Sequence, residues 1–396
     1  HAPENALTPP YSGQVQPIVV IGGGFAGLST ALGISRLHPR PAVVLIEPRD
    51  RFVFVPLLYE LMSGELKGWE VAPDYASLLE GHGISHLQDR VSSVDLNSST
   101  ITTASGQTLH YSQLVMATGA RPDDFGIPGV REHALNFHTL TDLQPLQERL
   151  QELRRHPSGS SSLVIAGAGA TGVELACKVV DLLNGAASVQ LIELGDQILP
   201  RSKAFNREQA EKALQKRGVT IHLNTKVESV SETSVMLSGQ QGTRELHHDG
   251  LVWTAGSRPT LPDLSPSMEL HRGRVPVTAA LRLSAYPNVL ALGDIAVDPE
   301  GDELTSWPHS AQAAIQQGQF AARELQTKLR HEDSKPFIFK DLGEMLSLGI
   351  GDATITGLGL TLAGPLAFKL RRLTYLTRLP GLSLGLRAAG AWLVSP

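Results

Sequence analysis

Two glycine clusters have the spacing that binds a pyrophosphate group. The pattern GxGxxG occurs twice, first at Gly22, Gly24 and Gly27 and again at Gly167, Gly169 and Gly172. Its first glycine permits a tight turn, its second lets the backbone approach a phosphate, and its third lets a helix pack closely on a strand. The free N–H groups at the start of that helix then attract the phosphate charge. Each cluster therefore predicts a dinucleotide-binding turn.

An acidic residue follows each cluster at the distance that a ribose contact requires. Glu47 and Glu193 lie about 20 residues beyond the last glycine of their cluster, each at the end of an apolar run. A carboxylate there accepts hydrogen bonds from ribose hydroxyls and repels a 2′-phosphate, so Glu193 favours NADH over NADPH. Arg201 is close enough in sequence to weaken that preference. The alternative is that the turns only pack a helix on a strand and the acids are solvated.

The elements that must position these residues form two copies of one unit. Strands are expected over 18–21 and 42–47 around the first cluster, and over 163–166 and 188–193 around the second. The two units end alike, in LVMATGARP and LVWTAGSRP. The first of these runs supplies three further cofactor candidates, Ala117, Thr118 and Gly119. The repeat predicts an α/β fold with two Rossmann-like dinucleotide-binding domains.

A further apolar strand and a long helix follow the second copy. The run NVLALGDIA ends near Asp294, and a helical pattern covers residues 310–329. Beyond Pro336 the chain becomes rich in Gly and Leu. The expected domains are a first part of one nucleotide-binding domain, a second nucleotide-binding domain, the remainder of the first, and a C-terminal module, at residues 15–125, 126–270, 271–335 and 336–396.

Composition excludes several classes of protein. The 396 residues carry 34 basic and 39 acidic side chains, a net charge of −5 without a dense basic run, which argues against nucleic-acid binding. A hydrophobic content of 41% with 18% charged residues excludes both a disordered chain and a polytopic membrane protein. The single cysteine, Cys177, can form neither an internal disulfide nor a CxxC pair, and no metal site is expected.

The positive charge gathers in the last part of the chain. Residues 353–396 contain five basic and no acidic side chains. A helical reading places four leucines on one stripe, namely Leu362, Leu366, Leu370 and Leu373, with Lys369, Arg371 and Arg372 off that stripe. This pattern predicts a helix lying in the interface of an anionic membrane, with its basic flanks directed outward. The alternative is a helix packed on the body or on a second subunit, and a homodimer would present two such tails.

The order of GGGFAG, ATGARP, GAGATGVE, TAGSRP and ALGDIA resembles the two-dinucleotide-domain flavoproteins over residues 18–318. The segments RFVFVPLLYELMSGEL, SAQAAIQQG and PFIFKDLGEMLSLG resemble type II NAD(P)H:quinone oxidoreductases, most closely their cyanobacterial and plastid branch. The resemblance implies FAD at the first loop, NADH or NADPH at the second, and a membrane quinone as acceptor. The lone Cys177 separates the chain from the branches that relay electrons through paired cysteines.

The resemblance also implies roles for individual residues. Asp294 would hold the flavin ribityl chain, Glu174 would meet the nicotinamide and relay a proton, and Gln312 and Ile315 would border the quinone with Gln316 beside them. The alternatives are a first-turn acid favoured by the helix dipole for Glu174, and a helix whose glutamines face solvent, as Gln316 and Gln317 could. Several bacterial members carry a basic residue where this chain has IGD at 350–352, so the corresponding cation is absent or comes from elsewhere.

The expected activity is non-proton-pumping hydride transfer from NAD(P)H through FAD to a prenyl naphthoquinone such as demethylphylloquinone, or to a plastoquinone-like acceptor. Such an enzyme would act as a peripheral protein on the cytoplasmic or stromal face of a thylakoid or plasma membrane, in phylloquinone biosynthesis or respiration. Two alternatives stay open: a soluble ferredoxin or rubredoxin reductase, and a flavin-bound NADH sensor. Quinone-dependent NADH oxidation would separate the first possibility from both alternatives.

Overall fold

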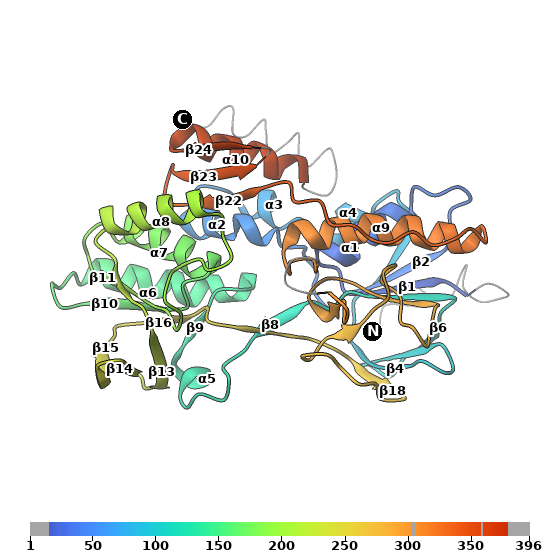
Figure 1. Cartoon of the computed structure of the whole chain (residues 1–396), viewed down its shortest axis with the longest axis horizontal. Coiled ribbons are helices and arrows are strands. Elements are labelled where there is room, and N and C mark those ends of the chain that lie inside the picture. Colours follow the sequence, from blue (N-terminus) through green and yellow to red (C-terminus); the bar gives the residue numbers. More distant parts are fainter. Residues whose placement is uncertain (1–15, 302–305, 358, 379–396) are drawn as a thin grey trace. The chain divides into compact units, whose positions relative to one another are not determined.

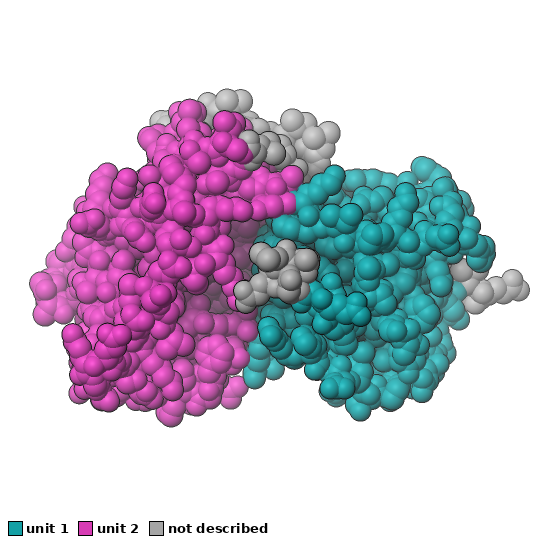
Figure 2. All heavy atoms as spheres, viewed as in Figure 1, with its two compact units in different colours: residues 1–52, 72–121, 258–340 teal, residues 53–71, 122–257, 341–396 magenta. Residues whose placement is uncertain are grey.

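The computed structural model describes residues 16–301, 306–357 and 359–378, which form two compact units (Figure 1, Figure 2). Among these residues, unit 1 contains those up to 52, 72–121 and 258–340, and unit 2 contains 53–71, 122–257 and 341–378. Segment 53–71 was expected with the first nucleotide-binding domain and the C-terminal segment as a module of its own, whereas both belong to unit 2. The tail from residue 379, with Arg387, lies outside the described residues.

Unit 1 is built on a parallel sheet of five strands in the order β20-β7-β1-β2-β3. Its strands are β1 (Ile18–Ile21), β2 (Val43–Ile46), β3 (Ile84–Leu87), β7 (Gln113–Met116) and β20 (Val289–Ala291). Every residue of β1, β2, β7 and β20 is buried. Continuous apolar strands of this kind are typical of a parallel sheet that is covered on both faces.

Helices α1 (Phe25–Ile34) and α9 (Ala311–Leu329) lie side by side in unit 1 (Figure 1). Glycines allow their close approach, because a Cβ on Gly33 would lie 2.6 Å from Cβ of Ala322 and one on Gly318 would lie 2.6 Å from the carbonyl oxygen of Ala26. The hydroxyl of Ser310 caps α9 by accepting the N–H of Ala313 at 3.2 Å. The helix predicted over 310–329 is therefore confirmed.

The remaining elements of unit 1 are short. A second sheet has the order β18-β4-β5-β6, with strands Asp263–Ser265, Val91–Asp95, Thr100–Thr103 and Thr108–His110. The others are α4 (Tyr75–Leu79), the pair β19 (Val275–Pro276) and β21 (Ala296–Val297), and the 3₁₀ turn η3 (Gly293–Ile295). Strands β8 (Ala120–Pro122) and β17 (Ser257–Pro259) lie where the chain passes between the units.

Unit 2 repeats the parallel sheet, in the order β12-β11-β10-β16-β9. Its strands are β9 (Leu135–Asn136), β10 (Ser162–Ala166), β11 (Ser188–Ile192), β12 (Thr220–His222) and β16 (Leu251–Trp253). The run β12-β11-β10-β16 corresponds strand for strand to β3-β2-β1-β7 of unit 1. The structure thus confirms the two Rossmann-like domains predicted from the repeated motifs.

Helices and a small antiparallel sheet surround this second parallel sheet. The helices are α5 (Val130–His133), η2 (Leu140–Asp142), α6 (Leu143–Arg155), α7 (Ala170–Leu183) and α8 (Ala204–Lys216). The antiparallel strands are β13 (Thr225–Val230), β14 (Ser234–Gly239) and β15 (Gly242–His247). Segment 53–71 adds η1 (Val55–Leu57), α2 (Leu58–Ser63) and α3 (Gly68–Val71), and α2 packs on α7.

The C-terminal part of unit 2 is a three-stranded antiparallel sheet followed by a helix. The elements are β22 (Glu344–Ser347), β23 (Ala353–Gly357), β24 (Leu360–Ala363) and α10 (Pro365–Arg378), with α10 packed on β23 and β24. Leu362 therefore lies in a strand, and its predicted place on the helical stripe is wrong. Among the described residues, no helix is at once long and apolar enough to span a membrane.

Candidate active site

The first glycine cluster forms a tight turn between β1 and α1. Gly22 adopts a φ of +96° and donates its N–H to the carbonyl oxygen of Ile46 at 2.9 Å. A Cβ on Gly22 would lie 2.1 Å from the carbonyl oxygen of Ala117, and one on Gly27 would lie 1.7 Å from that of Gly22. No atom lies within 4 Å of a Cβ built on Gly24, which caps the start of α1. The turn thus leaves open space where a phosphate would meet the helix N–H groups.

The second cluster has the same geometry between β10 and α7. Gly167 adopts a φ of +102° and donates its N–H to the carbonyl oxygen of Ile192 at 2.8 Å. A Cβ on Gly172 would lie 1.8 Å from the carbonyl oxygen of Gly167, and the space next to Gly169 is open within 4 Å. Both turns therefore meet the three requirements of a pyrophosphate-binding loop.

Each predicted ribose acid contacts its own glycine turn. Oε1 of Glu47 accepts the N–H of Gly23 at 2.9 Å, and Oε1 of Glu193 accepts the N–H of Ala168 at 3.0 Å. Gly23 and Ala168 occupy the same position in the two turns. The structure therefore places both acids beside the second residue of the turn that they were expected to serve.

Further polar contacts hold Glu47 and the turn that it contacts. Nη2 of Arg49 lies 3.1 Å from Oε1 of Glu47, and the hydroxyl of Tyr75 donates to the carbonyl oxygen of Gly23 at 2.5 Å. Burial alone would raise the pKa of Glu47, but its hydrogen bonds to Arg49 and to the N–H groups of Arg49 and Gly23, with the charge of Arg49, lower that pKa. Glu47 is therefore a fixed, ionised hydrogen-bond acceptor at neutral pH.

A buried side-chain amide from α9 lies next to the turn that follows β20, beside Asp294. The N–H of Gly293 donates to Oε1 of Gln317 at 2.7 Å, and Asp294 is the next residue in η3. Gln317 is fully buried, and its Nε2 has no hydrogen-bond partner among the described residues. A buried donor without an acceptor costs about 1–3 kcal/mol. The amide is thus a fitting donor for a polar group such as those of FAD.

The loop after β7 closes the side of the first turn. The N–H of Ala117 donates to the carbonyl oxygen of Ile21 at 2.8 Å, and the hydroxyl of Thr118 donates to the carbonyl oxygen of Thr260. Gly119 follows with a φ of +71°. The positive φ explains the glycine at 119, and the side-chain hydrogen bond explains the hydroxyl at Thr118.

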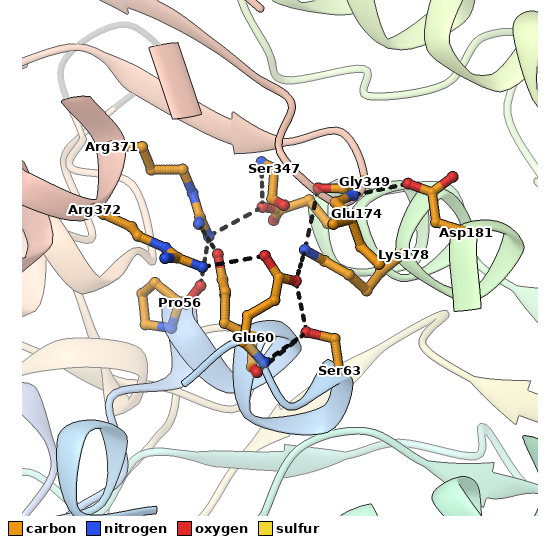
Figure 3. Close-up of polar contacts among 12 residues, drawn as sticks. Pro56, Glu60, Ser63, Glu174, Lys178, Asp181, Ser347, Gly349, Arg371 and Arg372 are labelled. Carbon is orange, nitrogen blue, oxygen red and sulfur yellow. Dashed lines mark hydrogen bonds and ion pairs between the residues drawn. The ribbon is translucent and has the colours of Figure 1, made fainter. Parts of the chain in front are cut away.

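Glu174 lies in the second turn of α7 within a buried polar cluster (Figure 3). Its Oε2 accepts the N–H of Ser347 at 2.8 Å and lies 3.7 Å from Nη2 of Arg371. Burial raises the pKa of the carboxyl to about 7, although Arg371 and the Ser347 N–H oppose that rise. Such a group changes its charge near neutral pH, which suits a proton relay.

Two arginines of α10 lie in the same cluster (Figure 3). Arg371 is fully buried and donates to a carboxylate oxygen of Glu60 and, at 2.6 Å, to the carbonyl oxygen of Pro56. Arg372 is partly buried, with Nη2 3.1 Å from Oε2 of Glu65. The prediction that both arginines form an outward basic flank is therefore wrong. They are directed inward because segment 53–71 supplies two acids beneath the helix.

Basic side chains also reach the loop between β22 and β23. Nζ of Lys178 donates to the carbonyl oxygen of Gly349 at 3.1 Å, and Asp181 accepts the N–H of Ile350 at 2.7 Å. Arg217 pairs with Asp181 at 2.9 Å. The loop itself carries no basic residue, but α7 and the end of α8 bring two cations to it.

The predicted quinone residues share one face of α9 in unit 1. Gln312, Ile315 and Gln316 have the spacing of neighbours on a helix, and each is half-buried. The side-chain amide of Gln316 forms two hydrogen bonds with the backbone of Lys340, at 2.8 and 3.0 Å. Gln317 points inward, so its expected alternative place on a solvent face is wrong.

Comparisons with known proteins agree with this geometry. The model of the pyridine nucleotide-disulphide oxidoreductase family matches residues 16–318. Demethylphylloquinone reductase NdbB of Synechocystis is 34% identical over 96% of both chains. The alternative NAD(P)H-ubiquinone oxidoreductase C1 of Arabidopsis thaliana is 35% identical over 92% of this chain and 78% of its own. A solved structure of NDH2 from Plasmodium falciparum superposes with a TM-score of 0.83 at 19% identity, over 95% and 97% of the two chains.

The chain belongs to the pyridine nucleotide-disulphide oxidoreductase family, as a type II NAD(P)H:quinone oxidoreductase. The cysteine chemistry of its dithiol relatives is not available to this oxidoreductase. Cys177 is fully buried on α7, and burial raises the pKa of its thiol to about 12. A thiol in that state is a packing residue and not a nucleophile.

Sequence reasoning missed three polar residues of this oxidoreductase. Gln317 lies in the SAQAAIQQG run but received no role there, and its burial follows from the packing of α9 on α1. Glu60 and Arg371 lie far apart in the sequence and pair only because segment 53–71 and α10 meet in unit 2. One signal was present: an arginine on an amphipathic helix requires a buried acid if it turns inward.

Proposed function

We propose that the enzyme transfers a hydride from NAD(P)H through FAD to a prenyl naphthoquinone such as demethylphylloquinone. The observation that carries this proposal is the full-length similarity to demethylphylloquinone reductase NdbB, joined to two intact dinucleotide turns. Bound FAD would accept two electrons with a proton and release them to a quinone. A plastoquinone-like acceptor makes similar demands on the site and is the second candidate.

The chain's own residues bind and orient the reactants. In this proposal the first turn, Glu47 and Asp294 of unit 1 hold FAD, and the amide of Gln317 donates a hydrogen bond to it. The turn at Gly167 and Glu193 in unit 2 hold NAD(P)H. Glu174 lies one helical turn into α7, near the end where the nicotinamide nucleotide would bind, and it positions the ring and carries a proton. Glu193 favours NADH because its charge repels a 2′-phosphate.

The quinone contacts are assigned to α9. Gln312 orients a quinone carbonyl without adding charge, and Ile315 offers an apolar surface to the ring. The amide of Gln316 is hydrogen-bonded to the backbone of Lys340. Gln316 therefore fixes the segment around Lys340 beside the quinone ring and does not contact the quinone carbonyl itself.

The outer face of α10 is proposed to lie on an anionic lipid surface. Leu366, Leu370 and Leu373 are 64%, 43% and 54% exposed, and Lys369 beside them is exposed too. The opposite face is packed, with Ala367, Phe368 and Tyr375 buried. An apolar outer face next to a cation suits a peripheral helix at the cytoplasmic or stromal membrane face. A homodimer that covers the same leucines is the competing outcome.

The function is tested by steady-state NADH oxidation with FAD-loaded enzyme in detergent. Acceptors are a demethylated prenyl naphthoquinone, a plastoquinone analogue and ferredoxin. We expect the highest kcat/KM with the naphthoquinone. Rapid turnover with ferredoxin and none with either quinone would contradict the proposal, as would a flavin that NADH reduces only over minutes.

Replacing Glu193 by Gln should lower the preference for NADH over NADPH by about tenfold. The amide loses the charge that repels a 2′-phosphate, while it still offers an oxygen to the N–H of Ala168. The measurement is the ratio of kcat/KM for the two nucleotides. The matched control is Glu47→Gln at the first turn, which should weaken FAD retention and leave that ratio unchanged. An unchanged ratio in Glu193→Gln would remove this residue from the ribose site.

Replacing Leu366, Leu370 and Leu373 together by Ser should abolish binding to anionic liposomes. Each leucine that enters the lipid contributes about 1.5–3 kcal/mol, so the triple variant should bind at least a hundredfold more weakly. Co-sedimentation with vesicles containing phosphatidylglycerol measures the change. The control is Leu360→Ser on β24, which is also exposed but lies outside α10. Unaltered sedimentation, with a dimer that falls apart in the triple variant, would assign the face to a second copy.

A further inference from the structure

Of the charged side chains that α10 directs inward, Arg371 is the one that is fully buried in unit 2. Arg371 is fully buried, although it lies on the same helix as the exposed leucines. The roles proposed above for the membrane and for hydride transfer do not involve Arg371. A buried charge is costly unless it is paired, so its partners show what it does.

The guanidinium of Arg371 is fixed by groups other than Glu174 (Figure 3). It donates to Glu60 and, at 2.6 Å, to the carbonyl oxygen of Pro56, while its Cζ lies 5.0 Å from the ring centre of Tyr375. Nη2 then lies 3.7 Å from Oε2 of Glu174, which is an electrostatic contact beyond hydrogen-bond length. The positive charge is therefore held beside Glu174 whether or not Glu174 is ionised.

Of the other groups around Glu174, some favour ionisation of its carboxyl and some oppose it. From β22 the N–H of Ser347 bonds to the carboxylate, and from its own helix the charge of Lys178 favours ionisation. From α2 the charge of Glu60 opposes ionisation, and the hydroxyl of Tyr59 lies within electrostatic range. Arg371 is the strongest of the attractive partners and the only one that α10 supplies among the described residues.

We propose that Arg371 is a positioning residue that holds Glu174 in its ionised form at the start of α7, and that Glu60 opposes it. Its consequence for hydride transfer rests on the proposed role of Glu174 at the NAD(P)H site. The electrostatic coupling itself does not depend on that role. It links the helix with the exposed leucines to the second dinucleotide turn through a single side chain.

The arrangement sets the direction in which each substitution should move the pKa of Glu174. Burial raises its pKa to about 7, and the charge of Arg371 is the largest influence that lowers it. Removing the charge of Arg371 should therefore move the midpoint of the protonation of Glu174 to higher pH. Removing the charge of Glu60 should move it to lower pH, because Glu60 then no longer competes for the guanidinium.

The test measures the protonation of Glu174 directly in the FAD-loaded enzyme. Infrared spectra collected as a function of pH show the carbonyl band of a protonated carboxyl, and Glu174→Gln identifies the band that belongs to Glu174. In Arg371→Gln we expect the midpoint to rise by about one to three pH units. In Arg371→Lys, which keeps the charge, the rise should be smaller. In Glu60→Gln we expect a fall.

A matched control lies next to Arg371 on the same helix. Arg372→Gln removes an equal charge, but Arg372 contacts Glu65 and the ring of Phe368, so the midpoint should move by less than half as much. The coupling is overturned if Arg371→Gln and Arg372→Gln shift the midpoint equally, or if Glu60→Gln raises it. If Arg371→Gln does not fold, Arg371→Lys and Glu60→Gln still decide the matter by their opposite directions.

The rate of flavin reduction by NADH, measured anaerobically against pH, separates the two proposals. If the midpoint of the infrared titration and the midpoint of the rate profile move together, both the coupling of Arg371 to Glu174 and the role of Glu174 at the nucleotide site stand. If the infrared midpoint moves while the rate profile does not, the coupling stands and the role of Glu174 at the nucleotide site fails. An infrared midpoint that does not move contradicts the inference whatever the rate does.

Discussion

Replacing Gly27 by Ala should produce an enzyme without FAD and without quinone reductase activity. A Cβ at this position would lie 1.7 Å from the carbonyl oxygen of Gly22, where only backbone could give way. Helix α1 must then move off β1, and its N–H groups leave the place where a pyrophosphate binds. We expect the purified protein to have less than a tenth of the flavin absorbance per chain of the original enzyme.

The equivalent change in the second turn is the matched control. Gly172→Ala would place a Cβ 1.8 Å from the carbonyl oxygen of Gly167, so the steric damage is the same. This variant should keep its FAD and lose reduction by NADH at least a hundredfold, while dithionite still reduces the flavin. Loss of FAD from both variants, or from Gly172→Ala alone, would contradict the assignment of FAD to unit 1 and NAD(P)H to unit 2.

The two dinucleotide domains could be predicted because their requirements are local. A turn that needs a φ near +100° at Gly22 and Gly167 admits few residues other than glycine, so the residue type itself records the backbone conformation. The acids Glu47 and Glu193 follow at a distance set by one helix and one strand. Periodicity of this kind is visible in a single sequence, and the sheet order then follows from the repeated unit.

The C-terminal part could not be predicted in the same way. Its leucine pattern fits a helix from residue 362, but Gly359 and Gly364, both with positive φ, allow the short strand β24 before the helix begins. The inward direction of Arg371 depends on its hydrogen bond to Glu60, which lies more than 300 positions earlier in the sequence. The sequence around Arg371 therefore does not show which acid the arginine pairs with.

Replacing Arg371 by Met should destabilise unit 2 by about 3–5 kcal/mol, because Glu60 would be left as an uncompensated charge in the interior. Glu60 is fully buried in the present structure. Urea unfolding of the FAD-loaded enzyme at pH 8, followed by far-ultraviolet circular dichroism, measures the loss. Arg372→Met should cost at most about 2 kcal/mol, since Lys178 still pairs with Glu65 at 2.6 Å.

The loss in Arg371→Met should shrink as the pH is lowered. Burial already raises the pKa of Glu174 in the folded state to about 7, and without the guanidinium this pKa rises further above that of the unfolded chain. The folded variant then binds more protons than the unfolded one, so its stability falls as the pH rises. Adding Glu60→Gln to Arg371→Met should restore most of the stability at pH 8, because the pair is removed as a whole. A double variant as unstable as Arg371→Met alone would show that the cluster stabilises by packing and not by compensation of charge.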